Sequence, residues 1–197
     1  MKPTYIQAVN RLLNVRGFFL FCIAALLIIP TGGCAGKRFS DIKAGIETRG
    51  HYIDGVPFYE QKEYACGPAA LASALAYWKY PVDLGYITSR VYLPKLHGTL
   101  PMDMERFAHD AGFKTESSVG TQETLKTAVT SNVPVICLLD LGFSVYKQPH
   151  YVTVTGFDDF NREFIMHDGI TPDRLMTFDT FDATWKRAGY WMLVMKP

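Results

Sequence analysis

The sequence predicts an α+β fold in which N-terminal helices pack on a C-terminal antiparallel sheet. Two observations indicate this class. Helix-type segments come first, with apolar residues spaced three and four apart and with proline or cap residues at their starts. From residue 133 onwards, short segments rich in β-branched and aromatic residues follow one another, separated by turn residues. Helices followed by strands are typical of α+β domains, whereas a doubly wound sheet would alternate the two.

The first predicted helix of the domain covers residues 66–78, which read CGPAALASALAYW. Its larger apolar residues recur at helical spacing, as expected of a buried helix. Pro68 fits the first turn, where its missing N–H would have no intrahelical partner anyway. Further helices are expected over residues 82–92, 101–111 and 121–131, with a loop at 97–101 and a strand at 113–119.

The second half of the chain is predicted to supply the sheet. The expected strands cover residues 133–139, 150–157, 162–167, 175–178 and 190–195, and a short helix is expected at 179–187. Residues 158–161, Asp-Asp-Phe-Asn, provide a turn between two of these strands. This turn predicts an antiparallel hairpin whose open ends lie side by side.

The N-terminus resembles a bacterial lipoprotein signal, and residues 1–33 are expected to be a signal peptide. Three basic residues precede a twelve-residue apolar run, which is short for a membrane span and suits a secretory signal. Small residues then lead into Cys34, as in a lipobox, so Cys34 is expected to carry the lipid. An uncleaved signal anchor is the alternative, and both interpretations export the domain.

The predicted domain boundaries follow from this signal. Residues 34–50 lack apolar periodicity and are expected to be a tether, leaving residues 51–197 as one domain. By resemblance to lipoprotein sorting signals, Ala35 after the lipidated cysteine implies the periplasmic face of the outer membrane. The membrane, through Cys34, is therefore an expected partner.

Composition excludes several function classes. The formal net charge is +1, and like charges form no runs, so nothing indicates nucleic-acid binding. The sequence contains no CxxC, HxxxH or HExxH motif and no phosphate-binding glycine loop, so no metal or cofactor is expected. The sequence leaves the oligomeric state open.

Cys66 is the cysteine with a predicted chemical role. Cys22 lies in the signal, Cys34 is the proposed lipid site, and Cys137 lies in an apolar run that reads as a buried strand. Cys66 begins a helix, where free N–H groups and the helix dipole favour a thiolate. A neighbouring imidazolium would lower the pKa of the thiol further and produce a nucleophile. The plainer alternative is a cysteine that only packs.

His150, Asp168 and Gln61 are the predicted partners of this cysteine. His150 begins one strand of the predicted hairpin and Asp168 ends the next, so the hairpin brings them together. The Asp168 carboxylate could then orient the imidazole, whose other nitrogen would face Cys66. The Gln61 side-chain amide and the Cys66 backbone N–H are candidate donors to an oxyanion. The alternatives are a solvent-exposed histidine, a turn-forming aspartate and a surface glutamine.

These residues carry a resemblance to the C39 family of papain-like cysteine peptidases. The similarity rests on Gln61 five residues before Cys66-Gly67-Pro68-Ala69, on His150-Tyr-Val-Thr-Val, and on Asp168-Gly169 after the hairpin. The resemblance implies a papain-like fold with Cys66 as nucleophile, His150 as base, Asp168 as orienting group and Gln61 in the oxyanion hole.

The predicted function is peptide-bond hydrolysis through a thioester by an exported, lipid-anchored cysteine peptidase, whose expected partner is a peptide or protein substrate. Two alternatives remain open at this point. The same triad could serve a peptidoglycan amidase or an acyltransferase, and a papain-like lipoprotein could bind peptides without cleaving them.

Overall fold

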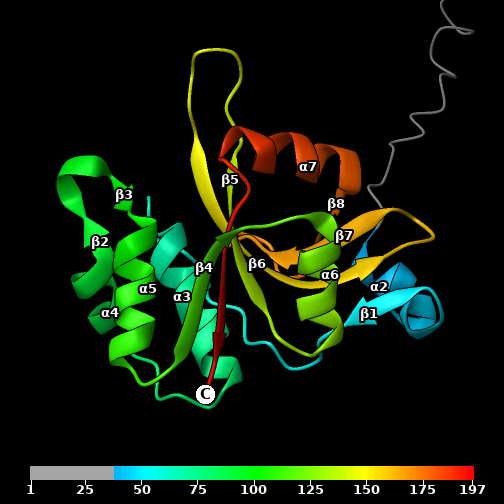
Figure 1. Ribbon diagram of the computed structural model, residues 1–197, viewed down its shortest axis with the longest axis horizontal. Helices are drawn as coiled ribbons and strands as arrows, with labels where there is room; N and C mark the ends of the chain where they lie inside the picture. The colour runs from blue at the N-terminus through cyan, green and yellow to red at the C-terminus, as the bar shows by residue number, and fades with distance from the viewer. Residues whose placement is uncertain (1–37) are drawn as a thin grey trace, which may run out of the picture. The chain divides into compact units, whose positions relative to one another are not determined.

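The computed structural model describes residues 38–197 (Figure 1). The predicted signal peptide and the proposed lipid site at Cys34 lie outside this range. Helices in the described part are α2 (Phe39–Ile42), α3 (Cys66–Tyr77), α4 (Leu84–Val91), α5 (Pro101–Asp110), α6 (Gln122–Thr130) and α7 (Phe178–Arg187), with 3-10 helices η1 (Lys43–Thr48) and η2 (Pro94–Leu96). Strands are β1 (Gly50–Tyr52), β2 (Tyr92–Leu93), β3 (Gly98–Thr99), β4 (Lys114–Val119), β5 (Val135–Asp140), β6 (Pro149–Asp158), β7 (Glu163–His167), β8 (Arg174–Thr177) and β9 (Trp191–Lys196).

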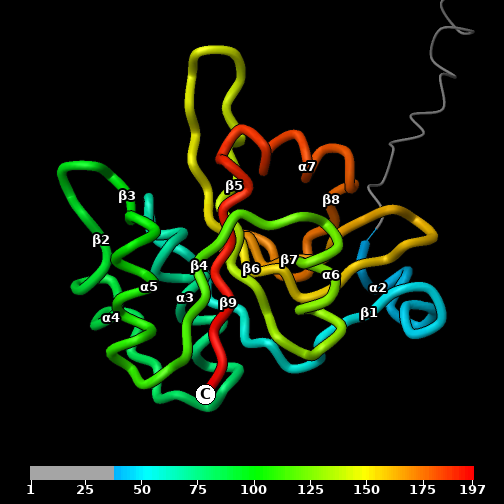
Figure 2. Tube along the Cα trace, viewed as in Figure 1, coloured from blue at the N-terminus to red at the C-terminus, as the bar shows by residue number. Residues whose placement is uncertain are grey.

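Within residues 38–197, seven strands form one sheet in the order β4-β9-β5-β6-β7-β8, and β1 pairs with the far end of β6. All of these pairings are antiparallel. In Figure 2 the red strand β9 runs between β4 and β5. Strands β6 and β7 form the predicted hairpin, with Thr153 opposite His167. The predicted α+β class is confirmed.

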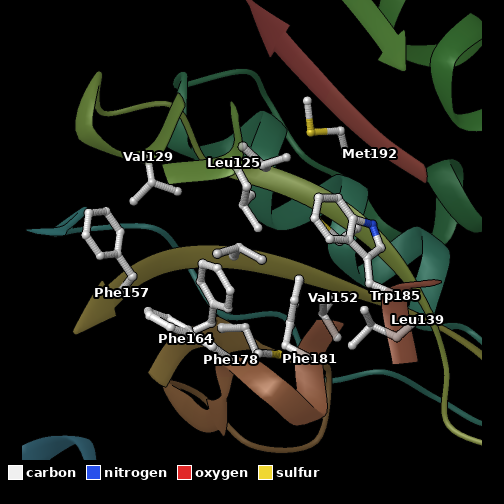
Figure 3. Close-up of a cluster of buried hydrophobic side chains, with 14 of the residues drawn as sticks. Leu125, Val129, Leu139, Val152, Phe157, Phe164, Phe178, Phe181, Trp185 and Met192 are labelled. Carbon is white, nitrogen blue, oxygen red and sulfur yellow. The ribbon is translucent and has the colours of Figure 1, made fainter. Parts of the chain in front are cut away.

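Helices cover both faces of the sheet. Helices α3, α4 and α5 pack on one face, where Ile136, Tyr151 and Leu193 join their core. Helices α6 and α7 pack on the other face. Successive strand residues point to opposite sides of the sheet, so the same strands supply apolar residues to both cores. Figure 3 shows this second core, in which Phe181 of α7 packs against both Phe164 of β7 and Trp185 of α7.

Helix α3 is central to the first core. Residues 67–75 are all buried, and four of these nine are alanine, which lets the helix approach both the sheet and its neighbouring helices closely. Thr153 of β6 donates its hydroxyl to the Ala70 carbonyl at 3.1 Å, which ties the middle of α3 to the sheet. The start of α3 is thereby held beside β6.

Residues 38–50 do not form the tether that the sequence predicts. They fold into α2, η1 and the start of β1, and Ile42 and Ile46 are each 3% exposed in a small cluster with Ile165. Arg49 pairs with the buried Asp158 at 3.0 Å. Two isoleucines on helices this short are too few to produce a visible apolar period, so this packing could not be predicted from the local pattern.

Cys137 is fully buried in β5, which confirms its predicted core position. None of the helices in residues 38–197 is long and apolar enough to cross a bilayer.

Candidate active site

Cys66 is the first residue of α3 and is half-buried. Burial raises the pKa of its thiol, and this effect outweighs the backbone N–H groups of Tyr151, Gly67 and Cys66 itself, which lower it. The pKa is therefore shifted opposite to the effect expected of a helix start alone, because desolvation disfavours the thiolate. A thiol in this state needs a base to become a nucleophile. The backbone amide of Tyr151 acts on the sulfur, and Tyr151 is the residue that follows His150 in the sequence.

Gly67 is required next to the cysteine because Thr99 packs against it. A Cβ at position 67 would lie 2.7 Å from the Thr99 Cβ and 2.8 Å from its hydroxyl. The Thr99 carbonyl in turn accepts a hydrogen bond from the Tyr151 hydroxyl at 3.0 Å. Strand β3 thus links the start of α3 to β6. Sequence reasoning missed this role of Thr99, although the glycine beside the cysteine was a signal of a close approach.

His150 is the second residue of β6, opposite Leu139 of β5. Its Nε2 lies 2.9 Å from the backbone carbonyl oxygen of Asp168. Because a carbonyl can only accept, this hydrogen bond requires the proton on Nε2 and leaves Nδ1 of the neutral ring as an acceptor. Burial lowers the pKa of His150, and this outweighs the opposite effect of the Asp168 charge. The neutral imidazole is thereby favoured, as a general base requires.

A clamped loop leads into His150. The β5–β6 loop, residues 141–148, projects from the sheet at the top of Figure 1. At its base the Asp140 carboxylate accepts hydrogen bonds from the backbone N–H groups of Gly142 at 3.0 Å and Gln148 at 2.9 Å. Arg187 of α7 donates to the carbonyls of Asp140 and Gly142. These contacts fix the chain where it enters β6, and so fix the backbone of His150.

Asp168 meets the imidazole through its main chain, not through the carboxylate as expected. Its carboxylate is buried and accepts from the backbone N–H groups of Ile170 at 2.8 Å and Thr171 at 2.6 Å, and from the Arg174 guanidinium at 2.7 Å. Burial raises the pKa of Asp168, but Arg174 and the two amides together hold it below its usual range. Gly169, at φ +78°, supplies the turn that directs the carboxylate to these donors.

Gln61 connects the segment before Cys66 to the segment after β7. Its backbone N–H donates to the Gly169 carbonyl at 2.8 Å. Its side-chain oxygen packs against Gly169 so closely that a Cβ there would lie 2.9 Å away. This oxygen is buried and has no hydrogen-bond partner within residues 38–197. Packing against Gly169, and not a hydrogen bond, therefore holds this side-chain oxygen in place.

The chain therefore brings the predicted site residues together from separate segments. Gln61 contacts the turn after Asp168, His150 bonds the Asp168 carbonyl, and the Cys66 sulfur meets the amide after His150. A cavity of about 220 Å³ adjoins the Gln61 segment, and its lining residues are Gln61, Lys62, Ala65, Leu84, Gly85 and Thr88. Sequence reasoning missed Arg174, because a basic residue six positions after an aspartate carries no local signal.

The remaining histidines of the described part have structural partners or exposed positions. His167 is buried, with Nε2 3.0 Å from the Val56 carbonyl and Nδ1 accepting from the Asp173 backbone N–H at 3.2 Å. His51 bonds Asn132, and His97 packs edge-on against Tyr64. In residues 38–197 no group of three or more His, Cys, Asp and Glu side chains could hold a metal ion.

Sequence comparison gives one match to a protein family. The family model described as "Peptidase_C39 like family" matches residues 53–192, which include all four predicted catalytic positions. No curated protein matches the chain.

Solved structures share the fold. The peptidase domain of Streptococcus ComA, a bi-functional ABC transporter, is 22% identical with a TM-score of 0.59, over 71% of this chain and 96% of that one. A double glycine motif protease from an AMS/PCAT transporter, solved with the leader peptide, is 22% identical with a TM-score of 0.61, over 75% and 94%. A C39-like peptidase from Bacillus anthracis is 15% identical with a TM-score of 0.63, over 75% and 98%.

Proposed function

Because the chain belongs to the Peptidase_C39 like family, we propose that it is a cysteine peptidase whose nucleophile is Cys66. The observation that supports this most directly is the bonding of His150. Its Nε2 bonds a carbonyl oxygen, which leaves Nδ1 as the acceptor, and its neighbour Tyr151 presents an amide to the Cys66 sulfur. A neutral thiol beside a neutral imidazole is a competent starting state for acyl transfer.

The proposed reaction has two halves. His150 Nδ1 takes the thiol proton as the Cys66 sulfur attacks the peptide carbonyl carbon, and the oxyanion is bound by the Cys66 backbone N–H and the Gln61 side-chain amide. The imidazolium then gives its proton to the leaving amine as the C–N bond breaks, leaving a thioester. In the second half, His150 deprotonates a water that attacks the thioester, and the proton returns to the sulfur as the acid product leaves.

A peptide is the substrate class that the relatives support. The double glycine motif protease was solved with a leader peptide, and a peptide is therefore the substrate class proposed for this chain. The amidase, acyltransferase and peptide-binding alternatives are separated by the experiment below.

The N-terminal signal supports a proposed location. We infer that Cys34 is lipidated after removal of residues 1–33, and that the domain is held at the periplasmic face of the outer membrane. The twelve-residue apolar run and the small residues before Cys34 support this. Metabolic labelling with palmitate should mark the wild-type chain and fail to mark the Cys34→Ser variant.

Profiling the protein against a complex peptide mixture tests the peptidase proposal. Wild type should generate new peptide termini, and Cys66→Ala should generate none while unfolding at an unchanged urea concentration. Cys137→Ala removes the buried thiol and should keep the activity. Cleavage by Cys66→Ala would refute the proposed nucleophile. Cleavage of cell-wall fragments but not of peptides would favour the amidase, and peptide binding by wild type without any cleavage would favour a binding protein.

A further inference from the structure

The Asp168 carboxylate stabilises the loop that follows it, residues 169–174. Both of its oxygens are occupied, one by the amides of Ile170 and Thr171 and the other by Arg174. The carbonyl of the same residue holds the imidazole of His150. The orientation of that carbonyl is therefore set by the loop conformation, and the loop conformation is set by the carboxylate contacts.

Arg174 is the only charged donor to this carboxylate among the described residues. It begins β8, where the sheet register places it opposite Met166 of β7. Its guanidinium crosses back to residue 168 while about half of its side chain, 47%, remains exposed. Removing the guanidinium would leave a buried carboxylate with two backbone donors and no counter-charge, which is an unfavourable state.

We propose that Arg174 is a positioning residue that acts through Asp168: it holds residues 168–174 in the conformation in which the Asp168 carbonyl orients the His150 imidazole. This inference rests on the proposed peptidase function and adds a residue to it. In this arrangement the carboxylate stabilises the loop and the main chain orients the base. The base therefore depends on a side chain that does not touch it.

The chain offers a matched control. Arg162 pairs with Asp179 at 3.1 Å, and both of these side chains are exposed, at 65% and 86%. An ion pair of this kind contributes little because solvent screens it. Arg162→Met therefore also removes a guanidinium that pairs with an aspartate, but from a position that has no contact with Asp168 or His150.

The experiment compares Arg174→Met, Arg174→Lys and Arg162→Met with wild type. Arg174→Met should lower kcat by roughly 10- to 100-fold with a smaller change in KM, since a displacement of about 1 Å at the reacting groups can cost this much. Arg174→Lys keeps a charge that can reach the carboxylate and should recover part of the loss. Arg162→Met should match wild type.

A second readout distinguishes positioning from general loosening. The charges that act on the pKa of His150 are those of Asp168 and Arg174, and the nearest titrating group on α3 is the Cys66 thiol. Arg174 lowers the pKa of His150, so Arg174→Met should move the acid limb of kcat/KM to higher pH. Nitrogen chemical shifts should show the Nε2–H tautomer of His150 in wild type and a mixture in Arg174→Met.

The outcomes separate the two proposals. An unchanged tautomer, an unchanged acid limb and unchanged kcat in Arg174→Met would overturn the role of Arg174. The chemical-shift measurement needs no substrate, so it tests the positioning role even if wild type cleaves no peptide. Absence of cleavage by wild type would count against the peptidase proposal alone.

Discussion

Replacing Gly67 by alanine tests the close contact beside the nucleophile. The new Cβ would lie 2.7, 2.8 and 3.2 Å from the Cβ, hydroxyl and methyl group of Thr99. Carbon atoms pack at about 3.5–4.0 Å, so β3 and the start of α3 must separate by roughly 1 Å. The Thr99 Cβ is attached directly to the backbone and cannot rotate away.

The expected cost comes from two opposing terms. Overpacking of this kind costs about 1–3 kcal/mol, whereas replacing glycine by alanine in a helix favours the folded state by about 1 kcal/mol. The net loss should be about 1 kcal/mol, or a fall in Tm of roughly 2–4 °C for a domain of this size. A 1 Å displacement of Cys66 should lower kcat/KM far more, by roughly 10- to 100-fold.

Urea unfolding and peptide cleavage would be measured on the same preparations. Gly85→Ala is the matched control, because Gly85 is likewise the second residue of a helix but its Cβ would meet only the end of the Asp83 side chain, at 3.2 Å. That variant should be neutral or slightly stabilised. Adding Thr99→Gly to Gly67→Ala should restore part of the activity. If Gly67→Ala equals Gly85→Ala in both measurements, the contact does not constrain the site.

Two further predictions concern stability. Burial raises the pKa of Asp158, but hydrogen bonds from Asn161 and the charge of Arg49 hold it below the usual value. Its stabilisation should therefore be complete above about pH 4 and be lost as the pH falls through the lower native pKa; Asp158→Asn should cost about 1–3 kcal/mol at pH 7 and flatten the dependence of the urea midpoint on acid pH. Ile46→Ala should cost about 2 kcal/mol, because Ile46 packs against Ile165, and urea unfolding would measure the loss.

Asp158→Asn has a control variant, and both predictions have an outcome that would contradict them. Asp159 is exposed and pairs with Lys126, so Asp159→Asn should leave the acid dependence of the midpoint almost unchanged. A slope for Asp158→Asn as steep as that of wild type would contradict the assignment. A change below about 0.5 kcal/mol in Ile46→Ala, as for an ordinary surface position, would mean that residues 38–50 behave as a tether after all.

Local patterns carried most of the fold. Pro68 correctly marked the first turn of α3, and the helix predicted from residue 121 onwards is capped by the Thr121 side chain. The turn at residues 158–161 correctly joined β6 to β7. These features depend on neighbouring residues, which is why a single sequence reveals them. The pairing of β4 with β9 joins residues 114–119 to residues 191–196. The local sequence of either strand does not indicate a partner so distant in the chain.

The sequence was sufficient to predict that residues 150 and 168 approach each other, but not how they bond. Strand order and turn position are sufficient to bring residue 168 near His150, so the pairing could be expected. Whether the imidazole meets a carboxylate or a carbonyl depends on a turn at Gly169 and on Arg174, which approaches from β8. The raised pKa of Cys66 could not be predicted either. A sequence indicates that the cysteine begins a helix, but not how far the fold removes its thiol from solvent.

The length of strand β6 sets the distance between His150 and the far end of the strand. His150 stands at one end, and Asp158, which is tied to Arg49, stands at the other. Eight residue steps of about 3.3 Å place them roughly 25–30 Å apart. A reporter dye attached at residue 159, which follows Asp158 and is exposed, would therefore stand well clear of an incoming substrate, yet within range for energy transfer to an acceptor on that substrate. Binding and release could then be followed without touching any residue of the reaction centre.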